Sequence, residues 1–220
     1  MKYIASRLCL VAMLMVAFGA WADIAGDVRK TVEDSTEFLV NKLEQERETY
    51  NTDPNKFYSV MEEALSDSVD FRRIAARVMG RYRREATSDQ KNAFVEAFKK
   101  SLFNAYGKTL VESGEFQIDV LNADVNPRDE DKATVELEVT TATGSKYPVV
   151  YAMYKNSNAQ KWLLENVVVN GVNIGLAFRD RFEQQYSQYN GDIDQVVTNW
   201  SSELAENEIK EASSDKGGQE

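Results

Sequence analysis

Residues 116–155 read FQIDVLNADVNPRDEDKATVELEVTTATGSKYPVVYAMYK, and apolar side chains recur there at every second position. The runs 116–120, 135–139 and 147–153 alternate apolar with other residues, which is typical of strands with one buried face. Turn-forming residues separate the runs at 127–131, 143–144 and 156–160. A further apolar run follows from Trp162 to Val169. The stretch therefore predicts a four-stranded antiparallel meander joined by short turns.

Helical spacing of apolar residues flanks the strands on both sides. Before the strands, the sequence predicts helices over 27–50, 54–65, 71–79 and from 88 onward. Asp53 and Asp70 are the predicted N-caps of the second and third helices, and Thr87 with Gln90 is a predicted capping box for the fourth. After the strands, helices are predicted over 174–189 and from Asp192. The predicted fold class is α+β, with the sheet packed against a set of helices.

The helix predicted from Ser88 onward is apolar around more of its girth than a surface helix requires. In GRYRREATSDQKNAFVEAFKKSLFNAYGKTL (80–110), apolar and small residues cover about half of the cylinder, whereas a core-facing stripe needs roughly 100°. Such a helix is either wedged between two layers or lines an apolar cavity. The helix pattern alone leaves both possibilities open.

The first 22 residues have the three parts of a secretory signal peptide. Lys2 and Arg7 are basic, residues 8–18 are apolar, and Ala20-Trp21-Ala22 fits a cleavage site. The apolar run is too short to span a bilayer, and no second membrane segment follows. We expect a signal peptide at 1–22, a single α+β domain at 23–204 and a flexible polar tail at 205–220.

The composition excludes several classes of chemistry. The chain has no His and a single Cys, at position 9, so Ser-His-Asp and Cys-His catalysis and the usual zinc sites are excluded. The acidic run 129–131 lacks the spacing of a calcium loop. We therefore expect no catalytic residue, no metal and no enzyme activity. The formal net charge of −10 disfavours nucleic acid and anionic membrane surfaces as partners.

Several separated motifs resemble the MlaC (toluene-tolerance) family of periplasmic phospholipid-binding proteins. These are GRYRREAT at 80–87, then the residues Gln90, Phe94, Phe98, Leu102 and Tyr106, then Trp162 with VVVNGVNI at 167–174, and FRDRF at 178–182. The resemblance covers nearly all of the chain after the predicted signal peptide, from about Val28 to Trp200. Three positions depart from the family pattern, because Arg83, Asn166 and Asn173 stand where an aromatic residue, Asp and Ser are usual.

The resemblance implies a soluble periplasmic carrier that shields acyl chains in an apolar pocket, enclosed by the sheet and the helices. It further implies that the carrier shuttles phospholipid between an outer-membrane lipoprotein complex and an inner-membrane MCE-type ABC transporter. This transport would maintain the lipid asymmetry of the outer membrane. Phospholipid would be the ligand of such a protein, with no cofactor, and the protein would not insert stably into a membrane.

The residues expected to contact lipid come from the predicted sheet and from the wide helix. The floor of the pocket is expected from Val135, Leu137, Val139, Val149, Tyr151 and Met153, the wall from Phe94, Phe98, Leu102 and Tyr106, and the rim from Val172 and Ile174. The same side chains would equally form a closed core.

Six arginines lie within residues 72–84 of an otherwise acidic chain. Arg77, Arg81 and Arg84 would lie near a lipid head group or an acidic partner, since guanidinium pairs well with phosphate and carboxylate. A charged helix face that offsets acidic neighbours is the simpler interpretation, and the sequence favours it.

Two other classes of protein compete with a lipid carrier. A periplasmic chaperone or peptide-binding module is the stronger alternative, because a wide apolar groove also holds peptide helices. An enzyme with a similar cone-shaped fold would need an acid or base inside the cavity, and the expected floor is apolar except for Tyr151.

Overall fold

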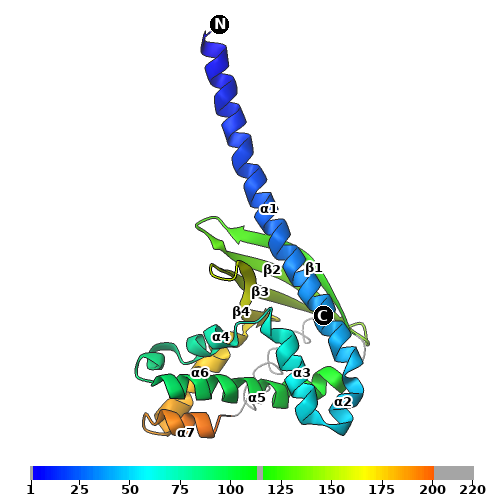
Figure 1. Cartoon of the computed structure of the whole chain (residues 1–220), viewed down its shortest axis with the longest axis vertical. Coiled ribbons are helices and arrows are strands. Elements are labelled where there is room, and N and C mark those ends of the chain that lie inside the picture. The colour runs from blue at the N-terminus through cyan, green and yellow to red at the C-terminus, as the bar shows by residue number, and fades with distance from the viewer. Residues whose placement is uncertain (1, 113–115, 201–220) are drawn as a thin grey trace, which may run out of the picture.

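The structure is a computed structural model that describes residues 2–112 and 116–200; the side chains of residues 2–23, 105–110 and 112 lie outside the description. Helices come first in the chain, then a sheet, then two more helices (Figure 1). The first group is α1 (Lys2–Gln45), α2 (Arg47–Thr52), α3 (Pro54–Ser66), α4 (Phe71–Val78), the 3-10 helix η1 (Gly80–Arg84) and α5 (Ser88–Glu112). The strands are β1 (Phe116–Asn126), β2 (Asp129–Thr141), β3 (Lys146–Asn156), β4 (Lys161–Val169) and β5 (Val172–Asn173), followed by α6 (Ile174–Gln188) and α7 (Ile193–Thr198).

Three helices begin where their capping residues predict. The carboxylate of Asp53 accepts a hydrogen bond from the backbone N–H of Lys56 at 3.1 Å, and Asp70 caps α4 in the same way. Thr87 and Gln90 form a reciprocal capping box, with bonds of 3.0 and 3.1 Å between side chain and backbone. These contacts satisfy amide donors that have no partner inside the helix. The predicted starts of α3, α4 and α5 are confirmed.

The strands form one antiparallel sheet in the order β1-β2-β3-β4-β5. The α+β class and the meander of four long strands are confirmed, but the predicted number of strands is wrong by one. Asn170 and Gly171 do not end the sheet. With φ values of 54° and 84°, they reverse the chain so that Val172 pairs with Val169. Asn-Gly is favoured in such two-residue hairpin turns because both residues tolerate positive φ.

A β-bulge interrupts the pairing of β3 with β4. Ala152 pairs with Asn166, and the next residue, Met153, pairs with Leu164. Glu165 is therefore an extra residue on β4, and its insertion changes the alternation of side chains along the strand. The sequence of β4 shows no simple period for this reason.

Helix α1 lies along β1 and β2 and covers one face of the sheet (Figure 1). Val28 and Val32 of α1 are almost fully buried there. They pack against alternate residues of the strands, among them Ala133, Val135, Leu137, Val149 and Met153. This layer is the sheet core of the molecule.

The helices α4, α5, α6 and α7 bury their apolar side chains mainly against one another. Phe94 and Phe98 of α5 meet Phe178 and Phe182 of α6 edge to face, with ring centroids 5.0 to 5.1 Å apart. Trp200 completes this helical core and donates a hydrogen bond to the hydroxyl of Ser101 at 2.9 Å. A third, smaller cluster joins α1, α2, α3 and α5 around Leu43, Phe57, Met61 and Val111.

Candidate functional site

An apolar cavity of about 70 Å³ lies between α1, the end of α3 and the sheet. Helix α1 contributes two apolar side chains to it, and β3 and β4 contribute Tyr151, Met153 and Leu164. The loop between α3 and α4 closes one side with Val69, whose backbone pairs with that of Leu164. The complete lining is Val32, Ser35, Thr36, Leu39, Leu65, Ser68, Val69, Tyr151, Met153 and Leu164.

Tyr151 is the only tyrosine among the residues that line this cavity. Its hydroxyl makes no hydrogen bond to any residue that the structure describes, and burial raises the pKa of the phenol above its ordinary value. The group therefore stays neutral at physiological pH, and its O–H is a hydrogen-bond donor that a ligand in the cavity would satisfy.

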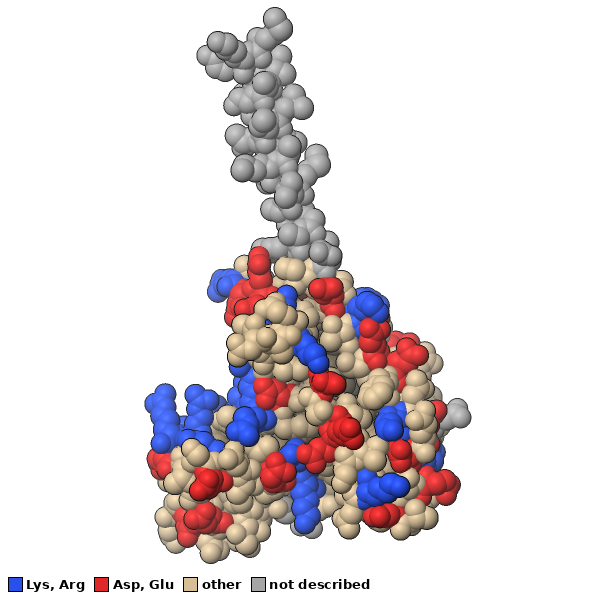
Figure 2. Space-filling view, in the orientation of Figure 1, with Lys and Arg blue, Asp and Glu red and all other residues tan. Residues whose placement is uncertain are grey.

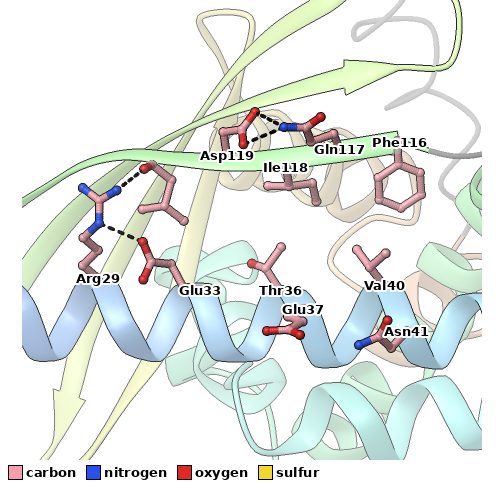
Figure 3. A pocket seen from close by; sticks show the side chains of 11 residues that line it. Arg29, Glu33, Thr36, Glu37, Val40, Asn41, Phe116, Gln117, Ile118 and Asp119 are labelled. Carbon is pink, nitrogen blue, oxygen red and sulfur yellow. Dashed lines mark hydrogen bonds and ion pairs between the residues drawn. The ribbon is translucent and has the colours of Figure 1, made fainter.

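A second hollow, of about 510 Å³, opens between α1 and the edge strand β1 (Figure 3). Its lining is polar as well as apolar, and it includes the carboxylates of Glu33, Glu37 and Asp119. Thr36 lines both this cleft and the apolar cavity, so the two spaces lie on either side of one residue of α1.

Arg29 connects α1 to β1 at one end of this cleft. Its guanidinium donates hydrogen bonds to the backbone carbonyls of Val120 and Leu121, the second at 3.1 Å, and pairs with Glu33 at 2.8 Å. Farther along α1, Thr36 and Val40 point across the cleft toward β1 (Figure 3). Arg29 thus binds β1 near the middle of the strand, and the cleft opens beside the preceding residues 116–119.

The structure brings together all six residues expected at the floor of the pocket. They belong to the sheet core, where residues directly opposite on β2 and β3 include Val135 with Tyr151 and Leu137 with Val149. Two of them, Tyr151 and Met153, line the apolar cavity itself. Val139 lies at the margin of the same core.

The residues expected at the wall lie elsewhere. Phe94 and Phe98 are at most 1% exposed inside the helical core, and Leu102 packs against that core, so the structure does not join them to the sheet residues. Tyr106 lies outside the described side chains. Of the expected rim, Ile174 packs on the helical core, and Val172 is a half-buried residue of β5.

A buried carboxylate organises part of the arginine cluster. Glu165, 5% exposed, accepts hydrogen bonds from Arg73, Arg77 and Lys132 at 2.6 to 2.9 Å. Burial raises the pKa of Glu165, but the bonds from Lys132 and Arg73 and the charge of Arg77 outweigh it, and the net pKa lies below its ordinary value. Arg73 also lies 3.9 Å from the ring centroid of Tyr154. Arg77, which the sequence placed near a head group or a partner, therefore binds the carboxylate of Glu165 within the same chain.

The other two arginines singled out in the sequence lie at the surface. Arg81 pairs with Glu183 at 2.5 Å and donates to the hydroxyl of Tyr82 at 2.7 Å. Arg84 is exposed and makes no ion pair with any residue that the structure describes. Neither side chain lines the apolar cavity.

Two amides join the end of the sheet to α6. Asn173 caps α6 through the N–H of Leu176, and Asn166 accepts a hydrogen bond from the N–H of Gly175, both at 3.0 Å. Asn166 also donates to Asn173 at 3.0 Å. The side-chain oxygen of Asn166 therefore accepts the hydrogen bond from the first turn of α6.

Several cavity residues are absent from the set expected from the sequence, namely Val32, Leu39, Leu65, Val69 and Leu164. Val32 and Leu39 belong to the apolar stripe of the first predicted helix, but the stripe alone does not show whether the helix packs on the sheet or on other helices. Val69 and Leu164 meet through a single bridge between a loop and β4, which no local pattern indicates.

The described part of the chain was searched for metal sites and for membrane-spanning helices. Among the residues whose side chains the structure describes, no group of three or more Asp, Glu, His or Cys is placed to hold a metal ion. Among residues 24–112 and 116–200, no helix is both long and apolar enough to cross a membrane.

Three comparisons with known proteins relate the chain to the same group of proteins. Residues 33–202 match the family model described as MlaC protein. The chain is 34% identical over 194 residues to the toluene tolerance protein Ttg2D of Pseudomonas putida, which covers 88% of each protein. Its fold is similar, with a TM-score of 0.70 and 16% identity, to a phospholipid-binding protein of Ralstonia solanacearum solved in complex with a phospholipid. That match covers 85% of this chain and 99% of the other.

Proposed function

Because the chain belongs to the MlaC family, we propose that it binds phospholipid and buries the acyl chains between α1 and the sheet. The family consists of lipid-binding proteins rather than enzymes. The relative from Ralstonia solanacearum, which shares the fold, binds a phospholipid.

The observation that carries this proposal is the apolar cavity and the polar cleft side by side at Thr36. A phospholipid has the same division, with apolar tails and a polar head group. Tails in the cavity would contact Leu39, Met153 and Leu164, while a head group in the cleft would keep its water. The hydroxyl of Tyr151 would donate to an ester oxygen where the tails begin.

The dimensions of the cavity require that the site opens when lipid binds. Its volume of about 70 Å³ is well below the roughly 300 Å³ at which ligand pockets begin. Two acyl chains therefore need α1 or α3 to move away from the sheet. Transfer of the tails from water supplies on the order of 20 kcal/mol, at about 0.8 kcal/mol per CH₂, to offset the lost contacts of α1.

We further propose a periplasmic shuttle between the outer-membrane lipoprotein complex and the inner-membrane MCE-type ABC transporter. The signal peptide predicted at residues 1–22 supports export. The net charge of −10 supports a carrier that does not adhere to anionic membrane surfaces.

Extraction of the natively purified protein with organic solvent tests the function. We expect mass spectrometry to find diacyl phospholipid in near-stoichiometric amount, and delipidated protein to take up fluorescent phospholipid. Folded protein, by circular dichroism, that neither contains nor takes up phospholipid contradicts the proposal and favours a chaperone or peptide-binding module.

A further inference from the structure

One end of this acidic molecule is basic. Arg72 and Arg77 on α4, Arg83 and Arg84 on η1, and Arg179 on α6 are all exposed, and we call these five residues the arginine surface. In Figure 2, Lys and Arg side chains gather at the left edge of the molecule, over the end of the helical bundle where Figure 1 labels α4 and α6.

Four of the five cations of the arginine surface have no carboxylate partner among the described residues, and the fifth, Arg77, pairs with Glu165. Arg83, Arg84 and Arg179 make no ion pair with any residue that the structure describes, and the bond of Arg72 goes to the neutral amide of Asn92. Two carboxylates close by are already engaged: Glu165 by Arg73, Arg77 and Lys132, and Glu183 by Arg81. Asp180 follows Arg179 in the chain but makes no ion pair with it.

The side chain of Arg179 lies beside Gly80. Its Nε is 3.5 Å from where a Cβ of residue 80 would stand, which is an ordinary contact distance. Arg179 therefore lies against the start of η1, the helix that carries Arg83 and Arg84.

An exposed apolar side chain, that of Leu176, lies among these arginines. A hollow of about 260 Å³ is lined by Arg77, Arg179, Ile74 and Leu176, together with Glu165, Asn166, Asn173 and Gly175. Leu176 is 49% exposed and lines this hollow together with the two arginines. Arginines around an exposed apolar side chain are typical of protein interfaces, whereas an anion-binding site needs no such side chain.

We propose that the arginine surface docks an acidic surface of a protein partner, with Leu176 entering an apolar recess of that partner. This inference rests on the proposed shuttle function, since a carrier must meet its donor and its acceptor. A protein partner fits better than an anionic membrane, because a flat anionic bilayer would also face the acidic remainder of the chain. The surface is separate from the cavity lining, so docking and lipid retention are measured independently.

The test uses the full chain with Arg83→Glu and Arg84→Glu. The matched control is Lys56→Glu with Arg128→Glu, two exposed cations away from the arginine surface, which changes the net charge equally. Association with the purified MCE-type transporter and with the purified outer-membrane lipoprotein complex is measured at low and high salt, and with phosphatidylglycerol vesicles as a third probe. Lipid content and circular dichroism are recorded for every variant.

We expect the arginine double variant to lose roughly tenfold in affinity for at least one protein partner, and to lose most of the salt dependence of that affinity. The control is expected to bind as the wild type does, and both variants to keep their lipid. Undiminished association with both partners, no association of the wild type with either, or a loss confined to the vesicles overturns the proposal. Absence of lipid from the wild type would instead contradict the proposed function.

Discussion

Val69 is the residue whose size bears most directly on the cavity. Its side chain lines the apolar space, while the backbone around it is held to β4: the N–H of Leu164 donates to the carbonyl of Ser68 at 2.8 Å. The backbone position is therefore fixed, and a larger side chain here extends into the cavity that Val69 lines.

Val69→Phe should fill the space in which we propose that the acyl chains lie. We expect a destabilisation of about 1–3 kcal/mol from overpacking and a several-fold loss of phospholipid uptake. Uptake of fluorescent phospholipid and urea unfolding measure the two effects. Val125→Phe, at a half-buried position of β1 outside the sheet core, is the control and should take up lipid normally. Full lipid uptake by folded Val69→Phe would place the acyl chains elsewhere.

At the scale of elements, Glu165 ties α4 to the sheet. Arg73 and Arg77 come from α4, Lys132 from β2, and the bulge on β4 places the carboxylate between them. The carboxylate is buried, but the three cations are 27 to 46% exposed, so solvent weakens each pair.

Glu165→Gln should lower the free energy of unfolding by about 1–3 kcal/mol at pH 7. Because the folded pKa of Glu165 lies below its ordinary 4.5, the contribution is full above that pH and is lost as the pH falls through the folded pKa. Urea unfolding from pH 7 to pH 3 should therefore show the wild type and the variant converging. Glu138→Gln, whose partner Lys146 is 63% exposed, should cost well under about 1 kcal/mol. A difference for Glu165→Gln that does not change with pH would argue against this charge network.

Over the whole molecule, local patterns predicted most of the helices and strands but not how they pack; β5 and the separate helices α2 and η1 were missed. The capping residues at 53, 70 and 87 and the alternation in β2 and β3 depend on neighbours in sequence, and they were confirmed. Phe94 and Phe98 show what a local sequence pattern cannot decide. Their wide apolar arc is equally suited to a cavity wall and to a closed core, and only the position of α6 and Trp200 decides it. The bulge at Glu165 and the bridge at Val69 depend on long-range pairing and leave no local pattern.

The central claim is that acyl chains lie between α1 and the sheet, and photocrosslinking of a bound lipid tests it most directly. The protein is loaded with a phospholipid that carries a diazirine in one acyl chain, irradiated, digested and sequenced by mass spectrometry. We expect crosslinks on cavity residues such as Leu39, Val69, Met153 and Leu164. Crosslinks confined to the helical core, at Phe94, Phe178 or Trp200, would contradict the claim.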